Sequence, residues 1–189
     1  MMTDYRDHKS SWDDRYRSRR CKSLQPEQFL IDHVTLLKPG SVLDIACGEG
    51  RNSIFLAQKG FKVSALDFSE VALNRLSNMS TENNLDIETI ELDLSESKNF
   101  ARLWKYDNII TIHFKLRDDL LELIPSLLNR NGIFLYCTFN KQHAEASTFP
   151  EKYALKKGEL IDKKWELERI KYTSFIDDAG YYDGYLFRR

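Results

Sequence analysis

From Val42 onward, short apolar runs alternate with longer amphipathic stretches along the chain. This alternation is typical of βαβ units, in which helices connect parallel strands and cover both faces of the sheet. Such strands are predicted at residues 41–46, 61–67, 86–93, 106–114 and 132–139. Helices are predicted at 52–60, from the Ser69 cap to about Met79, and at 118–128. The sequence therefore predicts an α/β fold with a doubly wound, mostly parallel, Rossmann-like sheet.

The repeat ends at Phe139 and is followed by a polar stretch, expected to be irregular, that runs to about Lys157. Two runs rich in aromatic and β-branched residues come next, at 165–175 and 181–189. A short segment with Asp177, Asp178 and Gly180 separates them, which favours a hairpin. Because a hairpin joins antiparallel strands, a C-terminal antiparallel hairpin is expected to complete a seven-stranded sheet.

Residues 1–38 precede the repeat and are expected to form an N-terminal helical cap or lid, with a helix from Pro26 to Leu37. The chain has 189 residues, no internal repeat and no Ser/Pro-rich linker. This length suits one compact domain. We therefore expect a single domain, 1–189, with its Rossmann-like core at 41–189.

Composition excludes several classes of partner. A net charge of −1 gives no general attraction to nucleic acid, and three cysteines without ligand spacing predict neither a disulfide framework nor a metal site. No apolar stretch approaches the ~20 residues that span a bilayer, and the first residues are too polar for a secretory signal. A cytoplasmic protein is expected, either a monomer or a homodimer.

The most informative motif is the glycine turn after the first strand, Asp44-Ile45-Ala46-Cys47-Gly48-Glu49-Gly50. Ligands of open α/β sheets bind at the carboxyl ends of the strands, and glycines let the backbone approach them closely. The helix that follows offers N–H groups to negative charge. Asp67, at the end of the second strand, is placed to accept hydrogen bonds from ribose hydroxyls. With Asp93 ending the third strand, the pattern predicts a nucleoside site.

Two alternatives share parts of this pattern. The NAD-binding motif GxGxxG requires glycine at position 53, where this chain has Ser53, and the chain leaves little room for a second mononucleotide half. A turn with two glycines can also serve only to connect a strand to a helix, without binding a ligand. Three aspartates that end consecutive strands favour nucleoside binding over both.

The segment VLDIACGEGRNSIFLAQKGFKVSALDFSEVAL, at 42–73, resembles motif I and the following motif of class I S-adenosylmethionine-dependent methyltransferases. Three further segments resemble the tellurite-resistance-type branch of these enzymes, which methylates small acceptors: WDDRYRS, ACGEGRNS and FPEKYALKKGELIDKKWELERIKY. One departure is Ala46, which replaces the first glycine of the usual turn. The resemblance implies S-adenosyl-L-methionine as the cofactor.

The same resemblance assigns cofactor contacts to individual residues. The turn residues would surround the methionine part of the cofactor, namely Asp44, Ala46, Gly48, Gly50 and Asn52. Asp67 would hold the ribose hydroxyls, while Phe68 would pack on the adenine or be an ordinary core aromatic. Asp93 and the Leu94 backbone would contact the adenine edge. Arg15 and Tyr16 would fold over the cofactor carboxylate.

Candidates for the acceptor site follow the fourth and fifth strands. Methyl transfer is an in-line displacement that needs a general base only if the nucleophile starts protonated. The catalytic candidates are His113, Arg117 and His143, and other residues at these strand ends are Phe114, Lys115, Asn140 and Lys141. His113 is suited to accept a proton or to play a structural part, and Arg117 to clamp an anion. His143 belongs to a stretch that is expected to cover the acceptor.

The function predicted from the sequence is methyl transfer to a small molecule: a tellurite- or selenite-type oxyanion, a thiol or another metabolite. An RNA or protein methyltransferase is the first alternative. The segment IHFK follows the fourth strand in place of the Asn-Pro-Pro-aromatic motif of base-amine methyltransferases, which disfavours base amines. The second alternative is a non-catalytic, cofactor-binding scaffold subunit.

Overall fold

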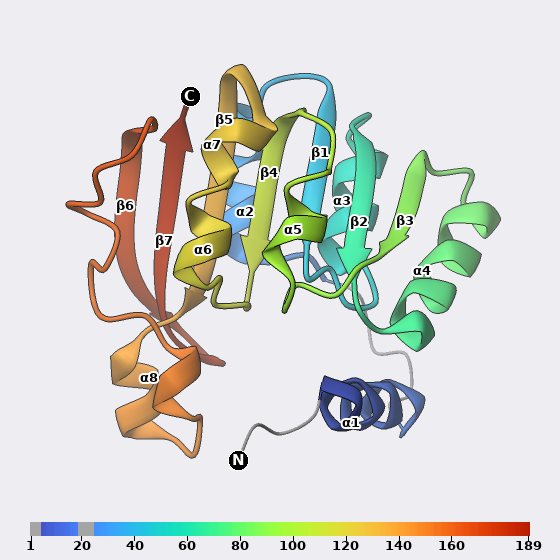
Figure 1. Cartoon of the computed structure of the whole chain (residues 1–189), viewed down its shortest axis with the longest axis horizontal. Coiled ribbons are helices and arrows are strands. Elements are labelled where there is room, and N and C mark those ends of the chain that lie inside the picture. Colours follow the sequence, from blue (N-terminus) through green and yellow to red (C-terminus); the bar gives the residue numbers. More distant parts are fainter. Residues whose placement is uncertain (1–4, 19–24) are drawn as a thin grey trace.

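The computed structural model describes residues 5–18 and 25–189. Its seven strands form one sheet in the order β3-β2-β1-β4-β5-β7-β6 (Figure 1). The strands are β1 (Ser41–Ile45), β2 (Lys62–Asp67), β3 (Ile87–Glu91), β4 (Tyr106–Ile112), β5 (Leu128–Phe139), β6 (Glu168–Asp177) and β7 (Gly180–Arg188). The first five are parallel, and β7 pairs antiparallel with both β5 and β6. The predicted Rossmann-like sheet and its C-terminal hairpin are confirmed.

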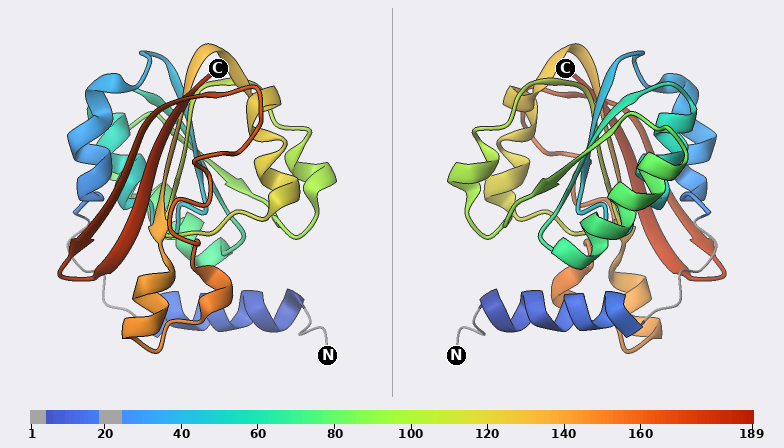
Figure 2. Two further views of the ribbon diagram at one scale, coloured as in Figure 1. Left: turned by 90° about the vertical axis from the view of Figure 1, so that its left-hand side faces the viewer. Right: turned by 90° about the vertical axis from the view of Figure 1, so that its right-hand side faces the viewer.

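Helices cover both faces of this sheet (Figures 1 and 2). The helices of the structure are α1 (Tyr5–Ser18), α2 (Gln28–His33), α3 (Arg51–Gln58), α4 (Glu70–Glu82), α5 (Ser97–Phe100), α6 (Asp118–Leu121), α7 (Ile124–Leu127) and α8 (Lys141–Ala146), with 3₁₀ turns at Val34–Leu36 and Glu151–Tyr153. Those that cover the two faces are α2 to α7. Apolar residues of α2, α3 and α4 pack with one set of strand side chains, and those of α5, α6 and α7 pack with the other. Alternate residues of each strand therefore feed two separate cores.

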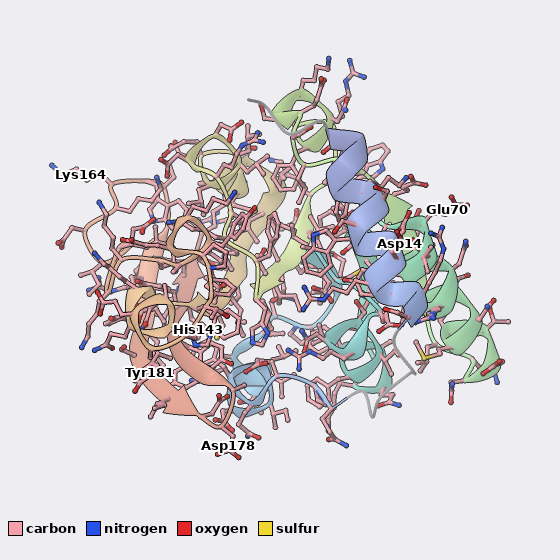
Figure 3. All side chains as sticks on the ribbon, turned by 90° about the horizontal axis from the view of Figure 1, so that it is seen from below. Asp14, Glu70, His143, Lys164, Asp178 and Tyr181 are labelled. Carbon is pink, nitrogen blue, oxygen red and sulfur yellow. The ribbon has the colours of Figure 1, made fainter. Side chains whose placement is uncertain are left out.

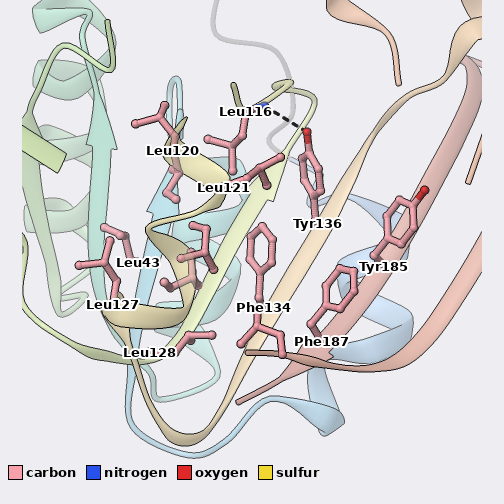
Figure 4. Packing of buried hydrophobic residues seen from close by; sticks show 14 of the residues in the cluster. Leu43, Leu116, Leu120, Leu121, Leu127, Leu128, Phe134, Tyr136, Tyr185 and Phe187 are labelled. Atoms are coloured by element: carbon pink, nitrogen blue, oxygen red, sulfur yellow. Dashed lines mark hydrogen bonds between the residues drawn. The ribbon is translucent and has the colours of Figure 1, made fainter. Parts of the chain in front are cut away.

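The core under α5–α7 is the more aromatic of the two and includes the C-terminal hairpin (Figure 4). Phe134 and Tyr136 of β5 lie beside Tyr185 and Phe187 of β7, and all four are buried. The Tyr136 hydroxyl accepts a hydrogen bond of 3.1 Å from the Leu116 N–H, which fixes the loop after β4. Burial of this kind contributes ~1.5–3 kcal/mol for each large side chain.

Several predicted elements differ from the structure. The helix expected from Pro26 to Leu37 is α2 followed by the 3₁₀ turn Val34–Leu36, and the strand expected at 132–139 begins at Leu128. The helix expected at 118–128 is divided into α6 and α7, because Pro125 lacks an amide hydrogen and so begins a new turn, and Leu128 already belongs to β5. The stretch after Phe139 is not wholly irregular, since it contains α8, which begins where the Asn140 side chain accepts a hydrogen bond from the Gln142 N–H. The third strand ends at Glu91, two residues before Asp93.

Both α1 and α8 lie beyond the carboxyl ends of the parallel strands, below the sheet in Figure 1. Figure 3 looks onto this end: α1, marked by Asp14, lies on one side of it, and His143 of α8 lies on the other. Helix α1 packs on α4. That this helix acts as a lid over the site stays a prediction. Among the described residues, no helix is long and apolar enough to cross a membrane.

Candidate active site

The glycine turn between β1 and α3 is built from residues in left-handed conformations. Ala46, Gly48 and Gly50 have φ values of 58°, 56° and 80°. The turn is tied to the sheet by a 3.0 Å hydrogen bond from the Cys47 N–H to the Leu66 carbonyl. A left-handed conformation costs a non-glycine residue ~1–2 kcal/mol, so Ala46 is strained where the usual motif has glycine. The strain at Ala46 is thus a consequence of this departure from the usual motif.

Glycine is required in this turn by packing as well as by backbone conformation. A Cβ atom at Gly50 would lie 2.3 Å from Leu76 Cδ1 of α4, and one at Gly48 would lie 2.9 Å from the Tyr16 hydroxyl of α1. The turn is therefore held between two helices. Tyr16, predicted to close over the cofactor, does lie against the turn. The Arg15 guanidinium lies 4.8 Å from the centre of the Trp12 ring on the same helix.

Two buried carboxylates flank the turn. Asp44 is 1% exposed and accepts a 2.6 Å hydrogen bond from the Ser53 hydroxyl. Burial, together with the nearby charge of Asp67, raises the pKa of Asp44 to about 7 even though the Ser53 hydrogen bond opposes this. A site that concentrates carboxylates in a low dielectric favours a ligand that carries positive charge.

Asp67 links the turn to the start of α4. Its carboxylate accepts hydrogen bonds from the Gly48 N–H at 2.8 Å and from the Ser69 N–H at 3.0 Å. Burial raises the pKa of Asp67, against these hydrogen bonds. The Ser69 hydroxyl in turn donates to Asp13 of α1. The lid, the ribose-binding candidate and the glycine turn thus form one connected group.

The remaining predicted cofactor residues are Phe68, Leu94, Asp93 and Asn52, and each has a different environment. Phe68 is partly buried and follows Asp67 directly. Leu94 packs against the core under α5–α7. The Asp93 carboxylate accepts from the N–H and hydroxyl of Ser95, so it shapes a local turn. Asn52 is buried, and its side-chain oxygen accepts a 2.9 Å hydrogen bond from the Glu27 N–H.

His113 directly follows β4 in a left-handed conformation, with φ of 59°, and both of its ring nitrogens face protein groups. Its Nε2 lies 3.0 Å from Glu27 Oε2, and its Nδ1 lies 3.3 Å from an Arg51 guanidinium nitrogen. Arg51 also pairs with Glu27 at 2.8 Å. Burial raises the pKa of Glu27, but His113 and Arg51 outweigh this effect and hold the pKa below its ordinary value.

The three catalytic candidates are not brought together as a group. His113 and His143 both contact Phe139, with ring centroids 4.9 and 4.2 Å from its own. Within the described part of the chain, the His143 ring has no hydrogen-bond partner. Arg117 lies apart from them, at the start of α6, where it forms two hydrogen bonds with the Asp119 carboxylate. Its exposed charge is thus largely neutralised by a neighbour in sequence.

Sequence reasoning missed the partners of these groups. Arg51 follows the motif glycine directly, and its position at the start of a helix gave no reason to pair it with His113. Glu27 lies in the N-terminal segment and is 5% exposed. An acid buried beside α2 was not detectable from apolar periodicity. Ser53 was considered as the residue in place of the third glycine of the NAD-binding motif and not as a partner of Asp44, although its hydroxyl donates a hydrogen bond to Asp44.

A family model described as Tellurite resistance protein TehB matches residues 9–181. The chain belongs to the TehB family. A probable S-adenosyl-L-methionine-dependent methyltransferase TehB from Haemophilus influenzae is 30% identical over 115 residues, which are 60% of this chain and 38% of that protein. The match thus spans about two fifths of that relative's length.

Solved structures of SAM-dependent methyltransferases share the fold of this TehB family member. The crystal structure of TehB from Haemophilus influenzae superposes with a TM-score of 0.72 and 21% identity, covering 96% of this chain and 66% of that one. Magnesium protoporphyrin IX methyltransferase from Synechocystis PCC 6803, with bound SAM, gives a TM-score of 0.61 and 21% identity, covering 96% and 79% of the two chains.

Proposed function

We propose that this chain binds S-adenosyl-L-methionine and transfers its methyl group to a small molecule. The observation that carries this proposal is the pair of buried carboxylates on the glycine turn, Asp44 and Asp67. The cofactor carries an ammonium and a sulfonium, whose positive charges two carboxylates stabilise. It also carries ribose hydroxyls, from which Asp67 is placed to accept hydrogen bonds. Family membership and the shared fold support the same assignment.

A dinucleotide cofactor fits this turn less well. Position 53, where the NAD-binding motif has its third glycine, holds a buried serine that donates to Asp44. That glycine normally lets the helix pack closely on the strand and leaves room for a pyrophosphate. The two buried carboxylates beside the turn, Asp44 and Asp67, also disfavour a pyrophosphate there.

The bound cofactor would supply an electrophilic methyl group, and the protein must orient the acceptor and exclude water. Helix α1, through Tyr16 and Asp13, would close the cofactor side of the site. His113 would act as a positioning residue, because its Nε2 lies 3.0 Å from Glu27 Oε2 and its Nδ1 lies 3.3 Å from an Arg51 guanidinium nitrogen, so both ring nitrogens face protein groups. The acceptor is therefore expected to present a lone pair that needs no deprotonation by His113, as an oxyanion or a thiolate does.

The test is S-adenosylhomocysteine production by the purified chain, measured with tellurite, selenite and small thiols as acceptors. Total RNA and a protein lysate serve as macromolecular acceptors in parallel reactions. Turnover with a small acceptor, and none with the macromolecules, is the expected result. Turnover with RNA or protein alone would overturn the small-molecule assignment, and turnover with none would favour a non-catalytic cofactor-binding subunit.

A further inference from the structure

A second feature at the carboxyl end of the sheet is a cleft of about 310 Å³ that the cofactor assignment does not use. Its lining consists of Lys115, Lys141, Glu151, Lys152, Ala154 and Lys156. The volume lies at the lower end of the ~300–1,000 Å³ typical of small-molecule sites. Because the whole chain has a net charge of −1, this gathering of lysines is local.

The lysines of the cleft are only partly neutralised. Lys141 lies 3.2 Å from Glu151, and Lys115 lies 3.5 Å from Glu159 while donating to the Ala154 carbonyl at 2.7 Å. The Lys152 ammonium lies 4.7 Å from the centre of the Tyr153 ring. Neither Lys152 nor Lys156 forms an ion pair with any residue in the part of the chain that the structure describes. The cleft therefore keeps an excess of positive charge.

The walls of the cleft are anchored to the sheet. The Lys141 N–H donates to the Leu155 carbonyl at 2.7 Å, and the Leu155 N–H donates to the Phe139 carbonyl at 2.9 Å, so the strap at 151–156 is bonded to the end of β5. Fully buried Asp183 of β7 accepts hydrogen bonds from Asn140, just before α8, and from the Gly158 N–H, just after the strap. A site held in this way loses little conformational freedom when a ligand binds.

The position of the cleft relates it to the proposed reaction. Lys115 follows β4 and Lys141 follows β5, and these are the strand ends from which acceptor residues are expected in an open α/β sheet. His143, on the same helix as Lys141, stacks on Phe139, which in turn contacts His113. A line of rings thus connects the cleft's helix with the residue that follows β4.

We propose that this cleft binds the anionic group, a carboxylate or a phosphate, of an organic methyl acceptor. The proposal rests on the proposed methyltransferase function. The ammonium group of lysine acts as a compact positive charge and is suited to binding such anions. A volume of about 310 Å³ accommodates an organic molecule and exceeds what a bare inorganic oxyanion fills. The anionic group would hold the acceptor while a separate nucleophilic atom receives the methyl group.

The experiment is an NMR titration of the full-length chain, saturated with S-adenosylhomocysteine, with citrate as the carboxylate probe and pyrophosphate as the phosphate probe. We expect the backbone amides of 151–157 to shift with one or both probes. In the double variant K152Q/K156Q, affinity for the probe should fall at least tenfold, while affinity for S-adenosylhomocysteine should stay unchanged. A larger effect with one probe identifies which anionic group the cleft prefers.

The matched control is K157Q/K164Q, which removes the same charge from lysines that do not line the cleft. It should bind the probes like the unmodified chain. An equal loss in both double variants, shifts confined to other surfaces, or no shift at millimolar probe would overturn the proposal. The anion titration is repeated on the chain without S-adenosylhomocysteine, so that anion binding is measured independently of the cofactor. Failure to bind S-adenosylhomocysteine would then count against the methyltransferase assignment and not against the anion site.

Discussion

Replacing Asp44 with asparagine should stabilise the cofactor-free protein while weakening cofactor binding. The pKa of Asp44 is raised from an ordinary value of 3.8 to about 7 by burial. The native state therefore holds a proton that the unfolded chain releases between these pH values, and stability falls as pH rises through this window. At ~1.4 kcal/mol per pKa unit, the full loss is up to about 4 kcal/mol. Asparagine stays neutral and retains an acceptor for the Ser53 hydroxyl.

The measurement is urea unfolding of both proteins without ligand at pH 5, 6, 7 and 8. The free energy of unfolding of D44N relative to the unmodified chain should grow by about 2 kcal/mol from pH 5 to pH 7 and then level off. Calorimetry at pH 8 should show at least tenfold weaker binding of S-adenosylmethionine by D44N. A pH-independent stability difference, or undiminished cofactor binding, would refute the reasoning.

Three further predictions concern neighbouring groups. G50A should lower the free energy of unfolding by about 2–4 kcal/mol, measured by urea unfolding, because its Cβ meets Leu76 in a left-handed backbone; an unchanged midpoint would contradict the packing. D67N should weaken S-adenosylmethionine binding about 10- to 100-fold in calorimetry, through loss of charge-assisted hydrogen bonds, and undiminished affinity would remove Asp67 from the site. H113N, which suits a left-handed conformation, should reduce turnover of an oxyanion or thiolate less than tenfold in steady-state assays, whereas a general base would cost ~10²–10⁴-fold.

The sheet was predictable because most of its strands can be recognised from their own residues. The central strands β1, β2 and β4 are short apolar runs whose residues are mostly buried, which leaves few other interpretations. The division of the helix at 118–128 depended on Pro125, whose effect competes with strong apolar periodicity. Helix α8 was missed because its six residues carry no buried side chain, so periodicity gave no signal.

In the site, too, the features set by residues near in sequence could be predicted, and those set by long-range contacts could not. The glycine turn and Asp67 could be predicted because their spacing follows from the geometry of one βαβ unit. The pairing of Glu27 with Arg51 and His113 joins the N-terminal segment, the first motif helix and the end of β4. Such contacts depend on how distant elements pack, which a single sequence does not specify. The lysine cleft likewise combines residues that follow two strands with a strap at 151–156.

The central claim is that the glycine turn and its carboxylates bind a positively charged sulfur nucleoside. Calorimetric titration of the full-length chain with S-adenosylmethionine, S-adenosylhomocysteine and NAD tests it most directly. We expect micromolar binding of both sulfur nucleosides and none of NAD, with S-adenosylmethionine binding strengthening as pH rises through about 7 and Asp44 ionises. Binding of NAD, or of no nucleoside by the folded protein, would contradict the account.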